Sequence, residues 1–175
     1  MKKNNIILIG MMGAGKSSIG KMLTKNLSGY SFIDTDDEIE REAGVTIPEI
    51  FSKYSEDYFR KLESETIRRV CKKSNQIIST GGGVFQSEEN RKVLLNSGNV
   101  FYLYAPSQIL YDRIKEQTAR PLLMCENPLK KVEELLEIRD INYRIADDII
   151  DTTSLDQGQV ANEILRRTDE TFDFS

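Results

Sequence analysis

The chain has 175 residues, of which 39% are hydrophobic, and this size and composition predict one compact domain with a single core. Its formal charge of −4, with 24 basic and 28 acidic residues interspersed, excludes a broad basic surface for nucleic acid. Histidine is absent, so neither an imidazole base nor a histidine metal site is possible. Cys71 and Cys125 form no C-x-x-C pattern, and we expect two reduced, mostly buried thiols.

The N-terminal apolar run follows Lys2 and Lys3 and so imitates the start of a signal peptide. It meets Lys16 without a small-residue cleavage pattern, and no stretch of the chain approaches the ~18 apolar residues of a membrane helix. We therefore expect a cytoplasmic protein without a membrane partner.

The first predicted element is a buried strand over Ile6–Ile9, and G-x-x-x-x-G-K-S follows it from Gly10 to Ser17. This spacing is the phosphate-loop pattern, in which backbone N–H groups crowd around phosphate because glycine has no Cβ. The helix that begins near Lys16 points its positive end at the same anion. Lys16 adds charge for the outer phosphates, and the Ser17 hydroxyl is placed to ligate Mg²⁺. Apolar spacing predicts an amphipathic helix behind the loop, with Ile19, Met22, Leu23 and Leu27 on its buried face.

The second predicted strand, Ser31–Asp34, runs into a cluster of carboxylates. Asp34 and Asp36 lie two residues apart, and strand geometry predicts that they point to the same side. Ligands of parallel α/β sheets gather at this edge, so one carboxylate can hold Mg²⁺ through water and the other can receive a hydroxyl proton. The alternative is an exposed acidic turn that continues into Asp37 and Glu38.

Two helical patterns follow. Thr46 and Glu49, with Pro48 in the first turn, predict a capping box. Over 58–71 the apolar residues recur every three to four positions, and Arg60 lies off this stripe with Glu63 one turn on, able to orient it.

The third predicted strand, Gln76–Thr80, ends in three glycines, Gly81 to Gly83, which permit the close approach of a ligand. A flexible turn is the alternative. Further strands are predicted over Val100–Tyr104 and Asp148–Asp151. Five strands that alternate with helices predict a parallel α/β sheet.

The segment from Glu116 to Pro128 has no helical stripe and is predicted to be a mobile flap. Pro121 holds Arg120 out of helical geometry, which suits a side chain that reaches inward. Arg139 lies in a helical pattern over 128–146. A solvated surface role is the alternative for each arginine. We expect the acidic tail over 168–175 to fray, although Phe172 and Phe174 can dock on the body.

A phosphate loop alone is shared by GTPase switches, ATP-driven motors and small-molecule kinases. The chain has no N-K-x-D segment of the kind that reads guanine, and it is short for a motor domain. A small-molecule kinase is therefore the leading class.

Six motifs taken together resemble the shikimate kinase family from about residue 5 to residue 167. They are GMMGAGKSS, FIDTDDEIE, FRKLE, STGGG, ARPLL and the stretch from Arg139 to Tyr143. The resemblance implies phosphorylation of the 3-hydroxyl of shikimate by ATP and Mg²⁺, on the route to chorismate and aromatic amino acids. It also implies a P-loop fold of the nucleoside-monophosphate-kinase type, an α/β domain over 1–175 whose five-stranded parallel sheet has the order 2-3-1-4-5. A lid at about 112–127 and a substrate-binding helical segment at about 35–63 belong to that fold.

The same resemblance implies the role of each site residue. Lys16, Asp36 and Arg120 would be catalytic, and shikimate would be held by Asp36, Arg60, Gly82 and Arg139. The ATP phosphates would be held by Gly13, Ala14, Gly15, Lys16, Ser17 and Ser18. Arg113 would lie near the adenine, Arg120 would close over the transferring phosphoryl group, and Ser17 and Asp34 would hold magnesium. The family often has a basic residue or proline in the loop after the last strand, whereas DTTSLDQGQ here leaves backbone contacts over 155–157.

The chemistry of the residues agrees with this resemblance, because guanidinium groups grip a carboxylate through paired hydrogen bonds. Asp36 is expected to accept the hydroxyl proton without a raised pKa, since nearby cations favour its ionised form. A kinase of another small hydroxy acid, such as gluconate kinase, or of a nucleoside monophosphate remains an alternative. A nucleotide-binding regulatory module without transfer activity is another. We expect a monomer, because no long exposed apolar face is evident.

Overall fold

Five short strands form one parallel sheet in the order β2-β3-β1-β4-β5, which confirms the predicted order. The computed structural model describes residues 4–116 and 125–171, with side chains described through Thr168. The strands are β1 (Ile6–Ile9), β2 (Ser31–Asp34), β3 (Gln76–Ser79), β4 (Asn99–Tyr104) and β5 (Asp148–Asp151). The bounds of β3 and β4 differ by one residue each from the sequence prediction.

Strand β1 lies at the centre of the sheet, between β3 and β4. Ile7 is in register with Ile78 of β3 and with Val100 of β4. All four residues of β1 are fully buried, because helices cover both faces of the sheet and leave no polar side to the strand. The carboxyl end of β1 is thereby fixed in the middle of the molecule, and the phosphate-loop sequence begins there.

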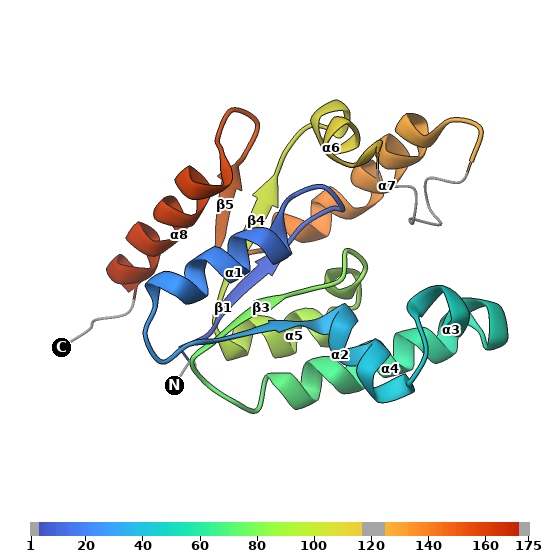
Figure 1. The fold of residues 1–175 in the computed structure, drawn as a ribbon, viewed down its shortest axis with the longest axis horizontal. Helices are drawn as coiled ribbons and strands as arrows, with labels where there is room; N and C mark the ends of the chain where they lie inside the picture. Colours follow the sequence, from blue (N-terminus) through green and yellow to red (C-terminus); the bar gives the residue numbers. More distant parts are fainter. Residues whose placement is uncertain (1–3, 117–124, 172–175) are drawn as a thin grey trace.

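The helices of the described ranges are α1 (Lys16–Asn26), α2 (Thr35–Ala43), α3 (Ile47–Lys53), α4 (Glu56–Val70), α5 (Glu88–Ser97), α6 (Ser107–Ile114), α7 (Pro128–Tyr143) and α8 (Gln157–Thr171), with a 3₁₀ turn η1 (Val84–Gln86). Helices α1 and α8 lie side by side on one face of the sheet, and α5 lies on the other (Figure 1). No helix within these ranges is long and apolar enough to cross a membrane.

Helices α2 and α3 and the first turns of α4 form a lobe beside the sheet (Figure 1), whereas Ile67 and Val70 of α4 belong to the main core. Ile39, Ile50 and Phe59, one from each helix, make a small buried cluster that is distinct from the main core. The predicted capping box is confirmed at the start of α3: Thr46 Oγ1 accepts from the Glu49 N–H, and Glu49 Oε2 accepts from the Thr46 N–H at 2.9 Å. Two acceptors thus satisfy the first turn of a short helix in this lobe.

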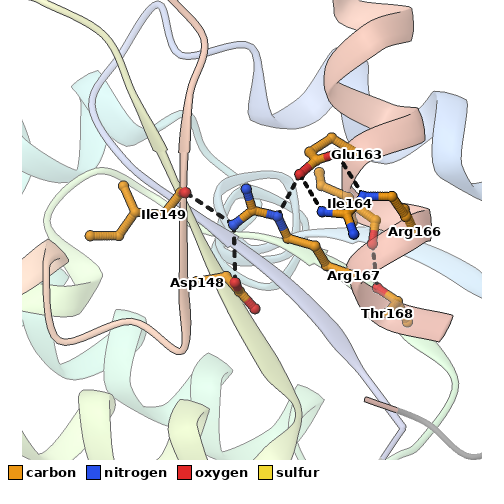
Figure 2. A network of polar contacts seen from close by, with 7 residues as sticks. All are labelled: Asp148, Ile149, Glu163, Ile164, Arg166, Arg167 and Thr168. Carbon is orange, nitrogen blue, oxygen red and sulfur yellow. Dashed lines mark hydrogen bonds and ion pairs between the residues drawn. The ribbon is translucent and has the colours of Figure 1, made fainter. Parts of the chain in front are cut away.

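The end of α8 is tied to β5 by one arginine (Figure 2). Arg167 Nη1 donates to Asp148 Oδ1 at 3.0 Å and to the Ile149 carbonyl at 3.2 Å, while its Nε donates to Glu163 at 2.7 Å. The buried Thr168 hydroxyl donates to the Ile164 carbonyl. The prediction that the chain frays from residue 168 is therefore wrong, because the helix continues to Thr171; Phe172 and Phe174 lie outside the described residues.

Two further predictions need correction. Cys71 is buried as expected, but Cys125 is exposed, so only one of the two thiols lies in the core. The helix expected over 128–146 ends at Tyr143, where Arg144 takes the cap position.

Candidate active site

A cleft of about 760 Å³ opens at the carboxyl ends of β1, β2 and β3. The phosphate loop, the lobe of α2 to α4, the glycine triplet and α7 all contribute to its walls. Most of the residues singled out in the sequence line it: Gly13, Ala14, Gly15, Lys16, Ser17, Ser18, Asp34, Asp36, Arg60, Gly82, Arg113 and Arg139. The predicted site residues of the described ranges therefore meet in one cavity.

The glycines of the phosphate loop are required by conformation as well as by space. Gly10, Gly13 and Gly15 have φ of 139°, 82° and 87°, in the region that side chains disfavour. A Cβ on Gly13 would also lie 2.6 Å from the Leu110 carbonyl oxygen. Lys16 Nζ donates to the Gly10 and Met11 carbonyls, each at 2.9 Å, and so holds its charge across the loop. Loop and lysine together form a receptor for phosphate at the N-terminus of α1.

Oxygen atoms from three elements meet next to the loop. The Ser17 hydroxyl donates to Asp34 Oδ2 at 2.6 Å and lies 3.2 Å from Ser79 Oγ. Hydroxyl and carboxylate oxygens are ligands that Mg²⁺ accepts, and the ion usually keeps waters and binds phosphate oxygens besides one or two protein groups. Within the described ranges no cluster of three or more carboxylate, cysteine or histidine side chains competes for a metal. The donor set therefore fits Mg²⁺ bound together with a nucleotide.

Asp36 faces the cleft for a different reason from the one predicted. It is the second residue of α2 rather than a strand residue, so the two-residue strand period does not apply. Asp34 caps that helix: its Oδ1 accepts from the Asp36 N–H at 3.1 Å, which turns the Asp36 side chain toward the glycine triplet. Asp36 Oδ1 is buried without a hydrogen-bond partner in the described structure.

The expectation that the pKa of Asp36 stays low is wrong. Burial, followed by the negative charge of Asp34, raises the pKa of Asp36 to about 6, although Lys16 acts in the opposite direction. The nearby cations lie too far away or are too well paired to offset the loss of solvation. The carboxyl group is therefore poised just below neutral pH.

Each glycine of the triplet makes room for one charged side chain of the site. A Cβ on Gly81 would lie 2.6 Å from Asp36 Oδ1, and one on Gly83 would lie 2.5 Å from Arg60 Nη1. A Cβ on Gly82 would lie 3.3 Å from Arg139 Nη1. None of the three has a positive φ, so space alone explains them. The sequence predicted the close approach of a ligand; in the structure, the groups that lie close to these glycines are the protein's own side chains.

The Arg60 guanidinium is held by carboxylates on its own helix, as predicted for Glu63. Its Nη1 donates to both Glu63 oxygens at 3.1 and 3.0 Å, and its Nη2 donates to Glu56 at 3.1 Å. Burial raises the pKa of Glu63, while the charge of Arg60, and then that of Arg139, opposes this shift. The two arginines approach the triplet from α4 and α7 and concentrate positive charge at one end of the cleft.

The far end of the cleft is formed by α6 and by the loop after β5. Arg113 donates to the Thr152 hydroxyl at 3.0 Å and to the Thr152 carbonyl at 2.6 Å, and these two bonds fix its guanidinium at the wall of the cleft. Arg120 and most of the predicted lid, residues 117–124, lie outside the described residues. The role of Arg120 stays a prediction.

Three contacts of the site were not foreseen from the sequence. Each joins two distant parts of the chain. Ser79 lies beside Ser17, and the Thr35 hydroxyl accepts from the Gly81 N–H at 3.1 Å. The Thr152 hydroxyl accepts from Arg113. Ser79 and Thr35 stand within quoted motifs, and that was the available signal. Thr152 lies 39 residues from Arg113 in the quoted loop DTTSLDQGQ, but the prediction for that loop concerned residues 155–157 and not Thr152.

Comparison with known proteins agrees with this geometry. The family model for shikimate kinase matches residues 12–169. A curated shikimate kinase from Thermodesulfovibrio yellowstonii is 45% identical over 162 residues, which cover 93% of each chain. The solved structure of shikimate kinase from Acinetobacter baumannii in complex with shikimate is 39% identical with a TM-score of 0.91, and the match covers 97% of this chain and 94% of that one. A gluconokinase from Sinorhizobium meliloti, at 15% identity and a TM-score of 0.65 over 98% of this chain and 94% of its own, shares the fold. The chain that carries this phosphate loop, Arg60, Arg139 and the glycine triplet therefore belongs to the shikimate kinase family, whose members phosphorylate shikimate with ATP.

Proposed function

We propose that Asp36, Arg60, Gly82 and Arg139 hold shikimate, while the loop from Gly13 to Ser18 holds the phosphates of ATP. The observation that carries this assignment is that both groups line one cleft of about 760 Å³. A cavity of this size holds both small molecules at once. Phosphoryl transfer requires the attacking hydroxyl and the terminal phosphorus to be aligned in one place.

The carboxylate of the acid would bind between Arg60 and Arg139. Both guanidinium groups lie against the glycine triplet, Nη1 of each within 3.3 Å of the point that a glycine Cβ would occupy. Glu63 and Glu56 already orient Arg60, so little side-chain freedom is lost when an anion binds. Planar guanidinium groups match a carboxylate through paired hydrogen bonds.

The hydroxyl that reacts would donate to Asp36. Its Oδ1 is buried without a partner, and a buried acceptor is costly unless a donor arrives. With a pKa of about 6, Asp36 is ionised at neutral pH and basic enough to take the proton. In the transfer, the hydroxyl oxygen bonds to the γ-phosphorus, the bond from phosphorus to the bridging oxygen of ADP breaks, and the proton passes to Asp36.

Positive charge at the phosphates would come from Lys16 and from the N-terminus of α1. Ser17 would hold Mg²⁺ directly and Asp34 would hold it through water; the ion, when bound, neutralises charge on the β- and γ-phosphates. Arg113, fixed by Thr152, would lie near the adenine. The lid at about 112–127 with Arg120, the helical segment at 35–63 as the acceptor lobe, and a cytoplasmic monomer remain predictions.

Incubation with Mg-ATP and an acceptor panel tests these assignments, with phosphorylated product detected by mass spectrometry and ADP release followed in a coupled assay. We expect phosphorylated shikimate, and no turnover of gluconate or nucleoside monophosphates. Turnover of gluconate without shikimate would reject the acceptor assignment. ATP binding without any phosphorylated product would favour a regulatory module.

A further inference from the structure

Tyr143, at the end of α7, joins the helix that carries Arg139 to the glycine triplet. Its hydroxyl donates to the Gly82 carbonyl, and its side chain is only 1% exposed. Tyr143 follows Arg139 by four residues, so both side chains leave α7 on the same face. A single helical turn therefore supplies a guanidinium to the cleft and a hydrogen bond to the backbone beside it.

The phenol of Tyr143 is held from several sides. Its ring packs against Tyr102 with a centroid distance of 4.9 Å. Met11 Sδ, in the phosphate loop, lies 3.8 Å from the hydroxyl and 3.8 Å from Arg139 Nη1. Burial raises the pKa of Tyr143 to about 12, with the charge of Arg139 acting the opposite way. The hydroxyl is therefore a protonated donor at any pH at which a kinase is assayed.

The hydrogen bond fixes the direction of the next peptide N–H. No cis peptide bond occurs in the described structure, so the Gly83 N–H points opposite to the Gly82 carbonyl, away from Tyr143. Within residues 4–116 and 125–171, the N–H groups of Gly82 and Gly83 have no acceptor. Both glycines line the cleft between Arg60 and Arg139. Two adjacent N–H groups without an acceptor, close to two guanidinium groups, are donors that an anion in the cleft can use.

We propose that Tyr143 is a positioning residue for the acceptor: its hydroxyl holds the Gly82–Gly83 peptide so that the backbone N–H groups and Arg139 receive the substrate carboxylate together. This proposal rests on the proposed placement of the carboxylate between Arg60 and Arg139. Tyr143 does not touch the acid itself. Without the hydroxyl, the peptide loses its partner and can rotate, and the carboxylate receptor loses its preorganisation.

The test is Tyr143→Phe, which keeps the ring and its packing on Tyr102 and removes only the hydroxyl. The matched control is Tyr102→Phe. Tyr102 is equally buried and its hydroxyl donates to Asp140 of α7 at 2.8 Å, but it does not contact the glycine triplet. Arg139→Ala, measured in the same assay, reports on the placement of the carboxylate.

We expect Tyr143→Phe to raise the KM for shikimate on the order of tenfold, the scale of one lost hydrogen bond to a buried group, with the KM for ATP within twofold of wild type. The rise in melting temperature that shikimate produces should shrink in parallel, a readout that does not depend on turnover. Tyr102→Phe should leave the shikimate KM within twofold. An unchanged shikimate KM in Tyr143→Phe, or an equal rise in both variants, would overturn the positioning role. If Arg139→Ala also leaves this KM unchanged, the placement of the carboxylate itself is wrong.

Discussion

Gly83→Ala tests whether the space beside Gly83, which Arg60 occupies, is needed for the function of that arginine. Gly83 has φ −90° and ψ −17°, a conformation that alanine adopts without strain. Elsewhere in a protein such a substitution would stabilise by about 0.4–1 kcal/mol through the unfolded state. Here the new Cβ would lie 2.5 Å from Arg60 Nη1, whereas ordinary van der Waals contact begins at 3.4 Å. The guanidinium must therefore retreat by about 0.9 Å.

If Arg60 binds the substrate carboxylate as proposed, the retreat weakens that contact. A hydrogen bond to a charged group contributes about 1.5–3 kcal/mol, which corresponds to about 10- to 100-fold in affinity. The Arg60 side chain is 38% exposed, so water screens part of this loss, and we expect a rise near tenfold in the KM for shikimate. The KM for ATP should stay within twofold, because Arg60 lies at the acceptor end of the cleft.

The assay is steady-state ADP release with shikimate and ATP varied separately, and the neighbouring glycines supply the controls. Gly82→Ala places a Cβ 3.3 Å from Arg139 Nη1, a clash that a small shift relieves, so its KM for shikimate should rise less than that of Gly83→Ala. Gly81→Ala places a Cβ 2.6 Å from Asp36 Oδ1 and should lower kcat rather than raise KM. A wild-type KM in Gly83→Ala, or the same response in all three variants, would refute the link between each glycine and one side chain.

Three further outcomes are expected. Asp36→Asn should lower kcat on the order of 10²-fold or more while ATP affinity, measured by calorimetry, stays within twofold; a kcat within twofold of wild type would show that Asp36 is not the base. Because the pKa of Asp36 is raised from 3.8 to about 6, the folded state binds the proton more tightly than the unfolded state, so wild-type stability falls as pH rises from about 4 to about 6. At pH 7.5, Asp36→Asn should therefore have a higher free energy of unfolding than wild type, by an amount on the order of 2–3 kcal/mol, and a higher melting temperature. The difference should vanish below pH 4, and a difference independent of pH would contradict the raised pKa of Asp36. Arg139→Ala should raise the KM for shikimate with little change in the KM for ATP, and an unchanged value would place the carboxylate elsewhere.

Much of the fold was predictable because its signals are local. The apolar run Ile6–Ile9 before the phosphate-loop pattern marks a buried central strand, and the alternation of strands and helices marks a parallel sheet. The order of the strands came from the resemblance to a known family, since no local pattern states which strands pair. The capping box from Thr46 to Glu49 spans only four residues, and it was predicted correctly.

The residues that line the cleft were likewise picked out from the sequence, whereas their ionisation was not. The raised pKa of Asp36 depends on how deeply the lobe of α2 to α4 buries it, which is a property of packing among distant segments. The strand argument for Asp36 failed because Asp34 caps a helix at that point, and the same residue types serve as strand ends and as caps. The prediction that the chain frays from residue 168 failed because the preceding residue, Arg167, is anchored to β5, a contact that no local pattern marks.

The small cluster of Ile39, Ile50 and Phe59 gives α2, α3 and the start of α4 an interior of their own. We expect substitutions within this cluster to leave the packing around β1 intact, so the wall of the cleft near Asp36 can change shape while the phosphate loop does not. The two walls of the cleft thus rest on separate apolar cores, one that includes Met11 and Ala14 of the phosphate loop and one that includes Ile39 of the helix that carries Asp36.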